Sequence, residues 1–361
     1  MKMRKIVCSF MISVVCFMTA ISGVSATSYD TSKINAAYSK VVEYYKNNNN
    51  LNNADKILAV ESLGLEAESN QFDTSSADLS STSLSKKIVT EVLLGVDPTE
   101  DKETLESQID ENGNVEGSWG ASSDIWTLYA LYATSSEKTN LLADKLNTDL
   151  ASSSVCGYEW GGTYYADYDT TGWVIEGLAV VNKEKYATTI NKAIDYIKNN
   201  TTMTTTGWVT ADNVDTQSQV LEGMFAYDTN ALLNDSYTVH PVDCLLNTQL
   251  SDGSFPSGYN AEYTTAEVAK TLGTYKNGSV IIKAKKAYDK MMNPEQPDNT
   301  KPAQPTDTKK DTQSTNKVET TNKKTTSVKT GDETNVVIFV SLSMVSGGLF
   351  LVLRKEYERV H

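Results

Sequence analysis

Histidine and cysteine are scarce in this chain of 361 residues, and that scarcity limits the chemistry available to it. The chain has two histidines, and one of them, His361, is the last residue. The other lies in "HPVDC", where His240, Asp243 and Cys244 are the types of residue that bind zinc, but no fourth ligand is evident. Pro241 favours a helix start at this place. We therefore expect a turn followed by a buried cysteine, and we predict no metal and no cofactor.

Catalytic signatures and positive charge are also lacking. The sequence shows no Ser-His-Asp set, no phosphate-binding loop and no nucleophile with a base at a recognisable spacing. The net charge is −14, and setting aside the +3 of residues 1–26 and the +1 of residues 294–361 leaves −18 on residues 27–293. So large a negative charge on residues 27–293 would repel the phosphate backbone, which argues against nucleic acid as a partner.

The N-terminal segment has the features of a secretory signal peptide. Residues 1–26 begin with basic side chains, continue with an apolar stretch over residues 6–21 and end in the small residues "VSA". We predict cleavage after Ala26 and export of the mature chain. Only Cys156 and Cys244 then remain, and they are candidates for a disulfide, although the sequence leaves their separation open.

The C-terminal segment predicts a stalk and an anchor. Residues 294–334 are rich in Thr, Lys and Pro and have almost nothing apolar, so they cannot offset the entropy cost of ordering and form a disordered stalk. Residues 336–353 carry no charge and are just long enough to cross a bilayer as a helix. Residues 354–361 begin with two basic side chains, which keep this tail cytoplasmic. One globular domain, residues 27–293, is left outside the cell.

The sequence "KTGD" (residues 329–332), followed by the apolar span and the basic tail, resembles the cell-wall sorting signal of Gram-positive surface proteins. The resemblance implies that a sortase cuts between Thr330 and Gly331 and joins the threonine to peptidoglycan. Ser327 and Val328 stand where that signal usually has leucine and proline. A plain membrane anchor therefore stays open as the alternative, and both predict an extracellular, tethered protein.

A repeat runs through the globular region. The segments "DTTGWVIEGL" (169–178), "DTQSQVLEGM" (215–224) and "YTTAEVAKTL" (263–272) align without a gap, and "SSDIWTLYAL" (122–131) fits more loosely. Their closing apolar residues are 47, 46 and 48 residues apart. Each copy follows a turn rich in glycine and aromatic residues, and an amphipathic stretch precedes each turn. One unit is thus a helix, a turn and a second helix.

Two weaker units, residues 54–65 and 83–95, bring the number of units to six. A helical hairpin cannot bury its apolar face alone, so neighbouring hairpins must stack. The second helices are the more apolar, and we expect them to form an inner wall. The sequence predicts an all-α fold, an α6/α6 toroid of six helical hairpins, followed by the stalk and one transmembrane helix.

The turn "QLSDGSF" (249–255) resembles the Gln-to-Trp repeat of terpenoid cyclases, with Phe255 in place of the tryptophan. The segment "YNAEYTTAEVA" (259–269) looks like the α/α toroid superfamily of terpenoid cyclases and protein prenyltransferases. The chain also resembles exported proteins with prenyltransferase and squalene oxidase repeats. Their toroid is similar to the helical domain of intrinsic factor and transcobalamin, which implies a corrinoid-like ligand. One fold hosts unrelated activities, so the resemblance bears mainly on fold.

Asp167 and Asp169 match the first two aspartates of the Asp-x-Asp-Asp motif of class II terpenoid cyclases, and Thr170 replaces the last. There the middle aspartate protonates the substrate, which requires a buried carboxyl near a second one. Two other interpretations stay open. An aspartate before Thr-Thr is an ordinary helix N-cap, and Asp215 recurs at the matching position before the next helix. A polar contact with a ligand is the third. We expect the aspartates to begin a helix.

Aromatic residues mark the turns and the starts of the second helices, which emerge at one end of the predicted barrel. Together with Asp167 and Asp169, these aromatic residues predict a ligand-binding rim at that end. The alternative is that the aromatic rings only fill the turns. The aromatic residues of the predicted rim are Trp119, Trp160, Tyr164, Tyr165, Trp173 and Trp208. The sequence favours a non-catalytic module that binds a small molecule, a glycan or a surface protein. The alternative is a cyclase-like or carbohydrate-active enzyme with Asp169 as general acid. A large apolar central cavity would favour the enzyme.

Overall fold

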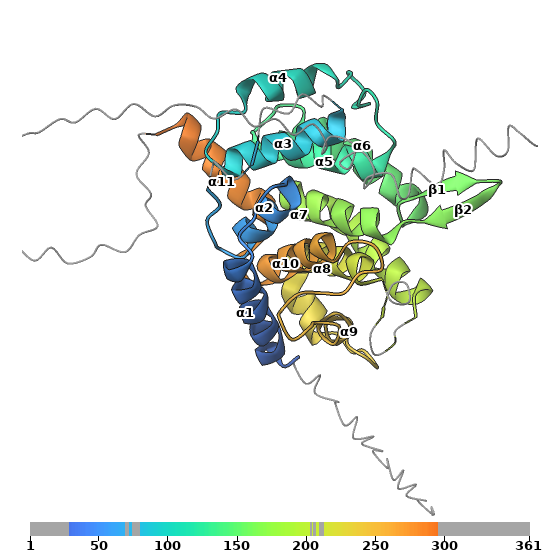
Figure 1. Ribbon diagram of the computed structural model, residues 1–361. Coiled ribbons are helices and arrows are strands. Elements are labelled where there is room, and N and C mark those ends of the chain that lie inside the picture. The colour runs from blue at the N-terminus through green and yellow to red at the C-terminus, as the bar shows by residue number, and fades with distance from the viewer. Residues whose placement is uncertain are drawn as a thin grey trace, which may run out of the picture. The chain divides into compact units, whose positions relative to one another are not determined.

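The computed structural model describes residues 29–68, 72–73, 80–202, 204, 207–208 and 213–294. Within them the chain forms eleven helices and one two-stranded hairpin, which confirms the all-α prediction (Figure 1). No helix among these residues is long and apolar enough to cross a bilayer. Several predictions lie outside the described residues: the signal peptide and Ala26, the stalk from residue 295, Thr330 and Gly331, the span 336–353 and the tail 354–361.

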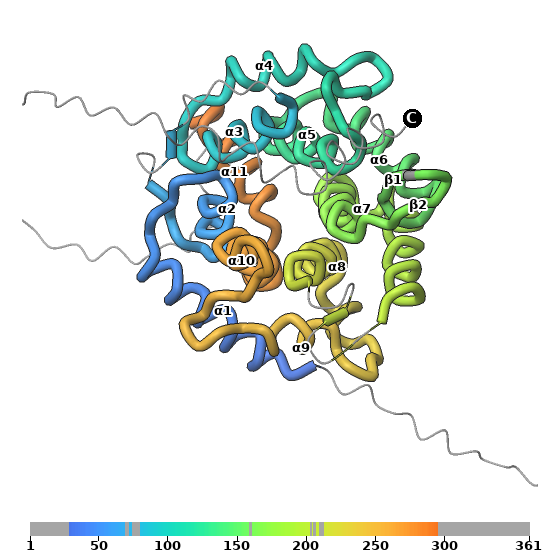
Figure 2. The backbone as a smooth tube through the Cα atoms, turned by 45° about the vertical axis from the view of Figure 1, so that its right-hand side comes forward, coloured from blue at the N-terminus to red at the C-terminus, as the bar shows by residue number. Residues whose placement is uncertain are grey.

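Six helices contact one another in cyclic order, and we call them the inner helices. Figure 2 shows them around a common centre. Each contacts the next, and the last contacts the first; they are α2 (Ala54–Ser62), α3 (Ser81–Leu93), α5 (Ala121–Ala133), α7 (Tyr168–Asn200), α8 (Val214–Asn234) and α10 (Ala261–Asn277). Four of them are the second helices of the repeat, and α2 and α3 are the two weaker units.

Two of the inner helices continue directly into outer ones. The backbone is extended at Asn182 in α7 and at Asp228 in α8, which ends each inner helix. Both side chains then cap the following helix, because Asn182 accepts a hydrogen bond from the Lys185 amide at 3.0 Å and Asp228 accepts one from the Ala231 amide at 2.9 Å. The chain thus turns from the inner to the outer layer without a loop.

The remaining outer helices pack against the inner ones (Figure 2). They are α1 (Thr31–Asn47), α4 (Thr99–Ser107), α6 (Thr139–Ser153) and α9 (Pro241–Leu246). Helix α1 contacts α9 and α10, α4 contacts α3 and α5, and α6 contacts α5 and α7. From α4 to α8 the chain therefore alternates between the two layers, whereas α2 and α3 follow each other and are both inner helices.

Glycines bring the inner helices unusually close together. A Cβ atom on Gly172 of α7 would lie 2.4 Å from the Gln219 carbonyl oxygen of α8, and one on Gly223 of α8 would lie 2.3 Å from the Gly172 carbonyl oxygen. Between α10 and α2, a Cβ on Gly273 would lie 2.6 Å from the Ser62 carbonyl oxygen. No side chain fits at these positions, so glycine sets the separation of the helices.

Helix α11 (Val280–Met292) departs from the alternating pattern. It contacts α2, α3, α5 and α10. The Lys283 ammonium pairs with Glu61 at the C-terminal end of α2 at 2.6 Å, and Ser135, just after α5, donates to Asp289 at 3.0 Å. Since both partners lie where inner helices end, α11 crosses the C-terminal ends of α2 and α5. Its buried face consists of Val280, Ile281, Ala284 and Tyr288.

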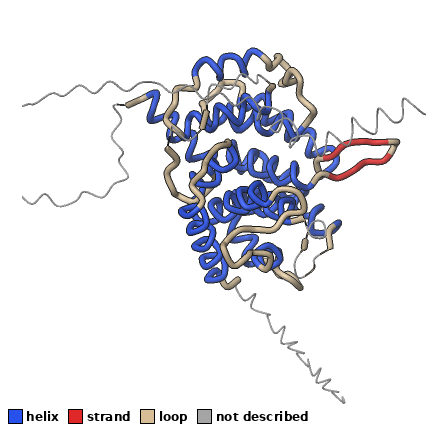
Figure 3. The backbone as a smooth tube through the Cα atoms, in the orientation of Figure 1, coloured by secondary structure: helices blue, strands red, loops and turns tan. Residues whose placement is uncertain are grey.

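The turn before α7 forms a β-hairpin, which the sequence did not predict. Strand β1 (Gly157–Trp160) pairs antiparallel with β2 (Thr163–Ala166), and Tyr158 lies opposite Tyr165. The two connecting glycines have φ values of +56° and +79°, the left-handed conformation that favours glycine in a two-residue hairpin turn. The hairpin projects from the helical body (Figure 3).

Candidate binding site at the N-terminal ends of the inner helices

The repeat places the same face of each inner helix toward the interior. Positions 1, 5 and 8 of the ten-residue frame share one helix face, because they are four and then three residues apart. These positions are Ser122, Trp126 and Tyr129 in α5; Asp169, Trp173 and Glu176 in α7; Asp215, Gln219 and Glu222 in α8; and Tyr263, Glu267 and Lys270 in α10. Residues at the same position of the frame contact each other in neighbouring helices, so these four inner helices run parallel.

The residues at the eighth position of the frame lie deepest in the interior, and two of them, Glu176 and Glu222, are acidic. The Tyr129 hydroxyl donates to Glu176 at 2.8 Å, and the Thr274 hydroxyl donates to Glu222 at 3.3 Å. Both carboxyls are buried, at 2% and 1% exposure. Burial raises the pKa of each, and for Glu222 the neighbouring charge of Glu176 raises it further. Together with α11 across this end, these contacts form the closed end of the interior.

A buried lysine balances part of this acidity. The Lys270 ammonium is 3.0 Å from Glu267, and both side chains are buried. Burial alone would lower the pKa of Lys270, but Glu267 and Glu222 raise it above its ordinary value. The same ammonium lies 5.4 Å from the ring centre of Trp126 and 6.0 Å from that of Trp173, within range of a cation–π interaction. The interior is therefore charged and aromatic rather than apolar.

Helix α7 begins as predicted at the aspartate pair, but with separate roles for its members. Asp167 is the N-cap, and its carboxylate accepts a hydrogen bond from the Thr170 amide at 3.1 Å. Asp169 lies inside the first turn, not at the cap, and is partly accessible. Burial raises the pKa of Asp169 to about 7, Asp167 adds to the rise, and a hydrogen bond with Thr216 opposes it. This value suits proton transfer at neutral pH.

The matching residue of the next helix corrects the sequence analysis. Asp215 does not merely precede α8: Asn213 is the N-cap, and Asp215 is buried in the first turn at 3% exposure. A short hydrogen bond joins the Tyr259 hydroxyl to Asp215. Tyr259 comes from the turn before α10, and 58% of it is exposed. Burial raises the pKa of Asp215, and the bond from Tyr259 opposes the rise.

Exposed aromatic rings gather at the loops that lead into the inner helices. Trp119 precedes α5, the hairpin tyrosines precede α7 and Tyr259 precedes α10; the exposed rings are Trp119, Tyr158, Tyr164, Tyr165 and Tyr259. The Tyr164 hydroxyl donates to the Val155 carbonyl at 2.8 Å, and Tyr158 stacks on Tyr165 with ring centres 5.5 Å apart. We call this end of the inner helices, where Asp169 lies in the first turn of α7, the open end.

Two other predicted rim residues behave differently. Trp173 is partly buried against Trp126, with ring centres 5.7 Å apart, so it lies in the interior just below Asp169. Trp208 is fully buried. The prediction that Trp208 contacts a ligand at the rim is therefore wrong, because its large apolar ring fills the core. The side chain of Trp160 lies outside the described part of the structure.

Both cysteines in the described part of the chain are free and buried. The Cys156 amide donates to the Thr171 hydroxyl at 2.9 Å, and the Cys244 thiol donates to the Thr204 carbonyl at 2.9 Å. The disulfide that the sequence left open is not formed. In the described ranges no three His, Cys, Asp or Glu residues are placed to hold a metal, and Asp243 instead accepts hydrogen bonds from Tyr29 and Lys33.

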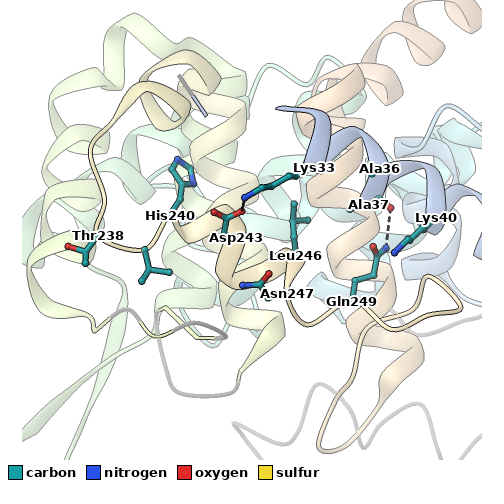
Figure 4. Close-up of a pocket in the computed structure, with 11 residues that line it drawn as sticks. Lys33, Ala36, Ala37, Lys40, Thr238, His240, Asp243, Leu246, Asn247 and Gln249 are labelled. Atoms are coloured by element: carbon teal, nitrogen blue, oxygen red, sulfur yellow. Dashed lines mark hydrogen bonds and ion pairs between the residues drawn. The ribbon is translucent and has the colours of Figure 1, made fainter. Parts of the chain in front are cut away.

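One cavity in the described part of the structure lies on the outside, between α1 and α9. It has a volume of about 450 Å³, and Figure 4 shows Lys33 reaching across it toward Asp243, with Lys40 and Gln249 at the far end. A second cavity of about 360 Å³ lies between α7 and α8. Neither is lined by a residue of the predicted rim.

Comparisons with known proteins give no further guidance. No family model, no curated protein and no solved structure matches this chain.

Proposed function

We propose that the chain is an exported α/α-toroid protein, tethered at the cell surface, whose open end is a non-catalytic binding site. The observation that carries the proposal is the asymmetry of the interior. Exposed aromatic rings stand on the loops into α5, α7 and α10, at the end where the partly accessible Asp169 begins α7, whereas α11 contacts inner helices at the opposite end. Aromatic side chains beside a few polar groups are typical of ligand sites.

The chemistry of the interior argues against a cyclase. An isoprenoid chain needs apolar walls, but this interior holds Glu176, Glu222, Glu267 and Lys270. Contact with these groups would remove them from their hydrogen-bond partners without replacing them, which is costly. A ligand that stays at the open end and offers hydrogen bonds meets no such cost.

A carbohydrate-active enzyme is the second candidate, and one observation favours it. Asp169 combines partial accessibility with a pKa raised to about 7, as a general acid requires. A second carboxyl, Asp215, lies in the matching turn of the next helix. Raised pKa values also occur in structural clusters of acids, and the deep glutamates are one such cluster, so binding without catalysis remains the first proposal.

Thermal unfolding of the wild type and of Asp169→Asn, each with corrinoids, isoprenoids and soluble glycans, tests both candidates. Asparagine keeps the shape and hydrogen-bonding capacity of the side chain but cannot donate the proton. We expect one ligand class to raise the unfolding temperature of both proteins without being altered. Product formed by the wild type alone would show an enzyme instead. No stabilisation by any of the three classes would contradict a ligand site at the open end.

Export, cleavage after Ala26 and sortase-dependent attachment at Thr330 belong to the same proposal. Their support is the order of the sequence features. Mass spectrometry of the mature protein released by cell-wall hydrolases tests them: we expect an N-terminus at residue 27 and a C-terminal threonine joined to a peptidoglycan fragment. An intact basic tail would identify a membrane anchor.

A further inference from the structure

We propose that the open end binds a neutral glycan and that Tyr259 is the ring on which one sugar stacks. The inference rests on the proposed binding function and names its ligand class. A sugar ring offers an apolar face to an aromatic ring and a rim of hydroxyl groups to hydrogen-bonding side chains. The open end presents both kinds of partner.

Tyr259 is exposed and yet held in place. Its hydroxyl is bonded to Asp215 of α8, and its amide donates to the Ser257 hydroxyl at 3.3 Å. The following residue, Asn260, is the N-cap of α10 and accepts from the Tyr263 amide at 3.1 Å. The ring is therefore fixed at both ends while 58% of the residue stays in contact with water. A fixed ring loses little conformational entropy when a ligand covers it.

Carboxyl groups stand at the starts of the helices at this end, and one of them, Asp215, accepts the hydrogen bond from the Tyr259 hydroxyl. Asp167 and Asp169 begin α7, and Asp215 begins α8. One turn below Asp215, the carbonyl oxygen of the Gln219 side chain is buried and has no hydrogen-bond partner within the described ranges. Its amide nitrogen donates to Glu267 at 3.2 Å. Sugar hydroxyls can donate to the carboxyls that begin α7 and α8. A donor that reached the Gln219 oxygen would also remove the cost of a buried acceptor without a partner.

The negative charge of the globular region limits the class of glycan further. The charge of −18 on residues 27–293 repels phosphate, sulfate and uronate groups, and the carboxyls at the open end offer such anions no positive partner. A neutral glycan meets no such repulsion. The stacked pair Tyr158 and Tyr165 on the hairpin adds a second aromatic surface on the loop before α7. Two separate surfaces favour a chain of several sugars over a single one.

Calorimetric titration of the full-length chain in detergent tests the inference. The probes are a β-1,4-linked N-acetylglucosamine tetramer, maltohexaose and cyanocobalamin. We expect a neutral oligosaccharide to bind, Tyr259→Ala to weaken binding about tenfold and Tyr259→Phe, which keeps the ring but loses its anchor, to weaken it less. Met292→Ala is the matched control, because it removes an exposed apolar side chain from α11 at the closed end, 48% exposed, and should leave binding unchanged.

The possible outcomes distinguish a failure of the glycan inference from a failure of the proposed binding function. Binding of cyanocobalamin alone would overturn the glycan class and leave the binding module standing. Oligosaccharide binding that Tyr259→Ala does not weaken, in a variant with an unchanged unfolding temperature, would overturn the role of Tyr259. Binding of none of the three probes would overturn the glycan inference together with the proposed function.

Discussion

Asp169 and Glu176 lie on the same face of α7, two helical turns apart, and burial raises the pKa of both, yet their surroundings differ. Asp169 is partly accessible beneath the aromatic loops. Glu176 is buried, bonded to Tyr129, and lies at the end that α11 crosses. The comparison shows that one repeat places carboxyls in two different surroundings. At the closed end they belong to an internal network, and at the open end Asp169 is partly accessible, which is where we propose that a ligand binds.

The largest expected effect lies in the internal network. Lys270→Met leaves Glu267 and its neighbours buried without their cation, and removing one partner of a buried pair costs about 3–5 kcal/mol. Urea unfolding measures this loss. The double variant Lys270→Met/Glu267→Gln removes the uncompensated charge and should recover part of it. A single variant as stable as the wild type would show that the network does not support the fold.

The second-largest expected effect is a change in the pH dependence of stability when Asp169, at the open end, is replaced. The folded-state pKa of Asp169, about 7, lies above its ordinary value of 3.8. Folding therefore favours the protonated carboxyl, and the wild type loses stability as the pH rises from about 4 to about 7. Asp169→Asn has no proton to lose, so we expect it to exceed the wild type by roughly 2–4 kcal/mol at pH 8 and to match it near pH 4. Parallel stability curves over this range would contradict the raised pKa.

A smaller effect concerns the contact that keeps α7 and α8 in register. Gly172→Ala places a methyl group 2.4 Å from the Gln219 carbonyl oxygen, so the helices must separate, at a cost of about 1–3 kcal/mol. Gly258→Ala is the matched control, because nothing lies within 4 Å of its added Cβ. Chemical denaturation of both variants measures the difference. Equal stabilities would show that the close approach of the two helices is not required.

The smallest effect separates the two aspartates of α7. Asp167→Ala removes the N-cap bond to the Thr170 amide and should cost about 1 kcal/mol, whereas Asp167→Asn should cost only a few tenths. Thermal unfolding of the two variants gives this comparison. If Asp167→Asn is as costly as Asp167→Ala, the role of Asp167 is not capping.

The parts of the fold that could be predicted from the sequence are those that the repeat specifies. Its spacing predicted the helices that include α5, α7, α8 and α10, and its first position contains Asp169 and Asp215. Its fifth and eighth positions contain Glu176, Glu222, Glu267 and Lys270, whose role was not predicted. Reading the inward face of the repeat, rather than the turns alone, would have found them. Trp208 shows the limit of the turn pattern, because an aromatic residue in a turn can face the core or the solvent with the same local sequence.

Other features depend on contacts distant in sequence. The crossing of α11 rests on Lys283 with Glu61 and on Asp289 with Ser135, pairs separated by more than 150 residues. The bend at Asn182 replaces a loop by one capping side chain, which resembles an ordinary helical residue in sequence. The anchoring of Tyr259 likewise requires α8 and the turn before α10 to be already side by side.

The most direct test of the central claim is a map of ligand contact by NMR. The chain has five tryptophans, and Trp119 and Trp173 report on the open end, while His240 lines the outer cavity between α1 and α9. During titration with the oligosaccharide that binds, we predict shifts in the indole N–H signals of Trp119 and Trp173 and none in the His240 imidazole. Shifts confined to His240 would place the ligand in the outer cavity and contradict the proposed open-end site.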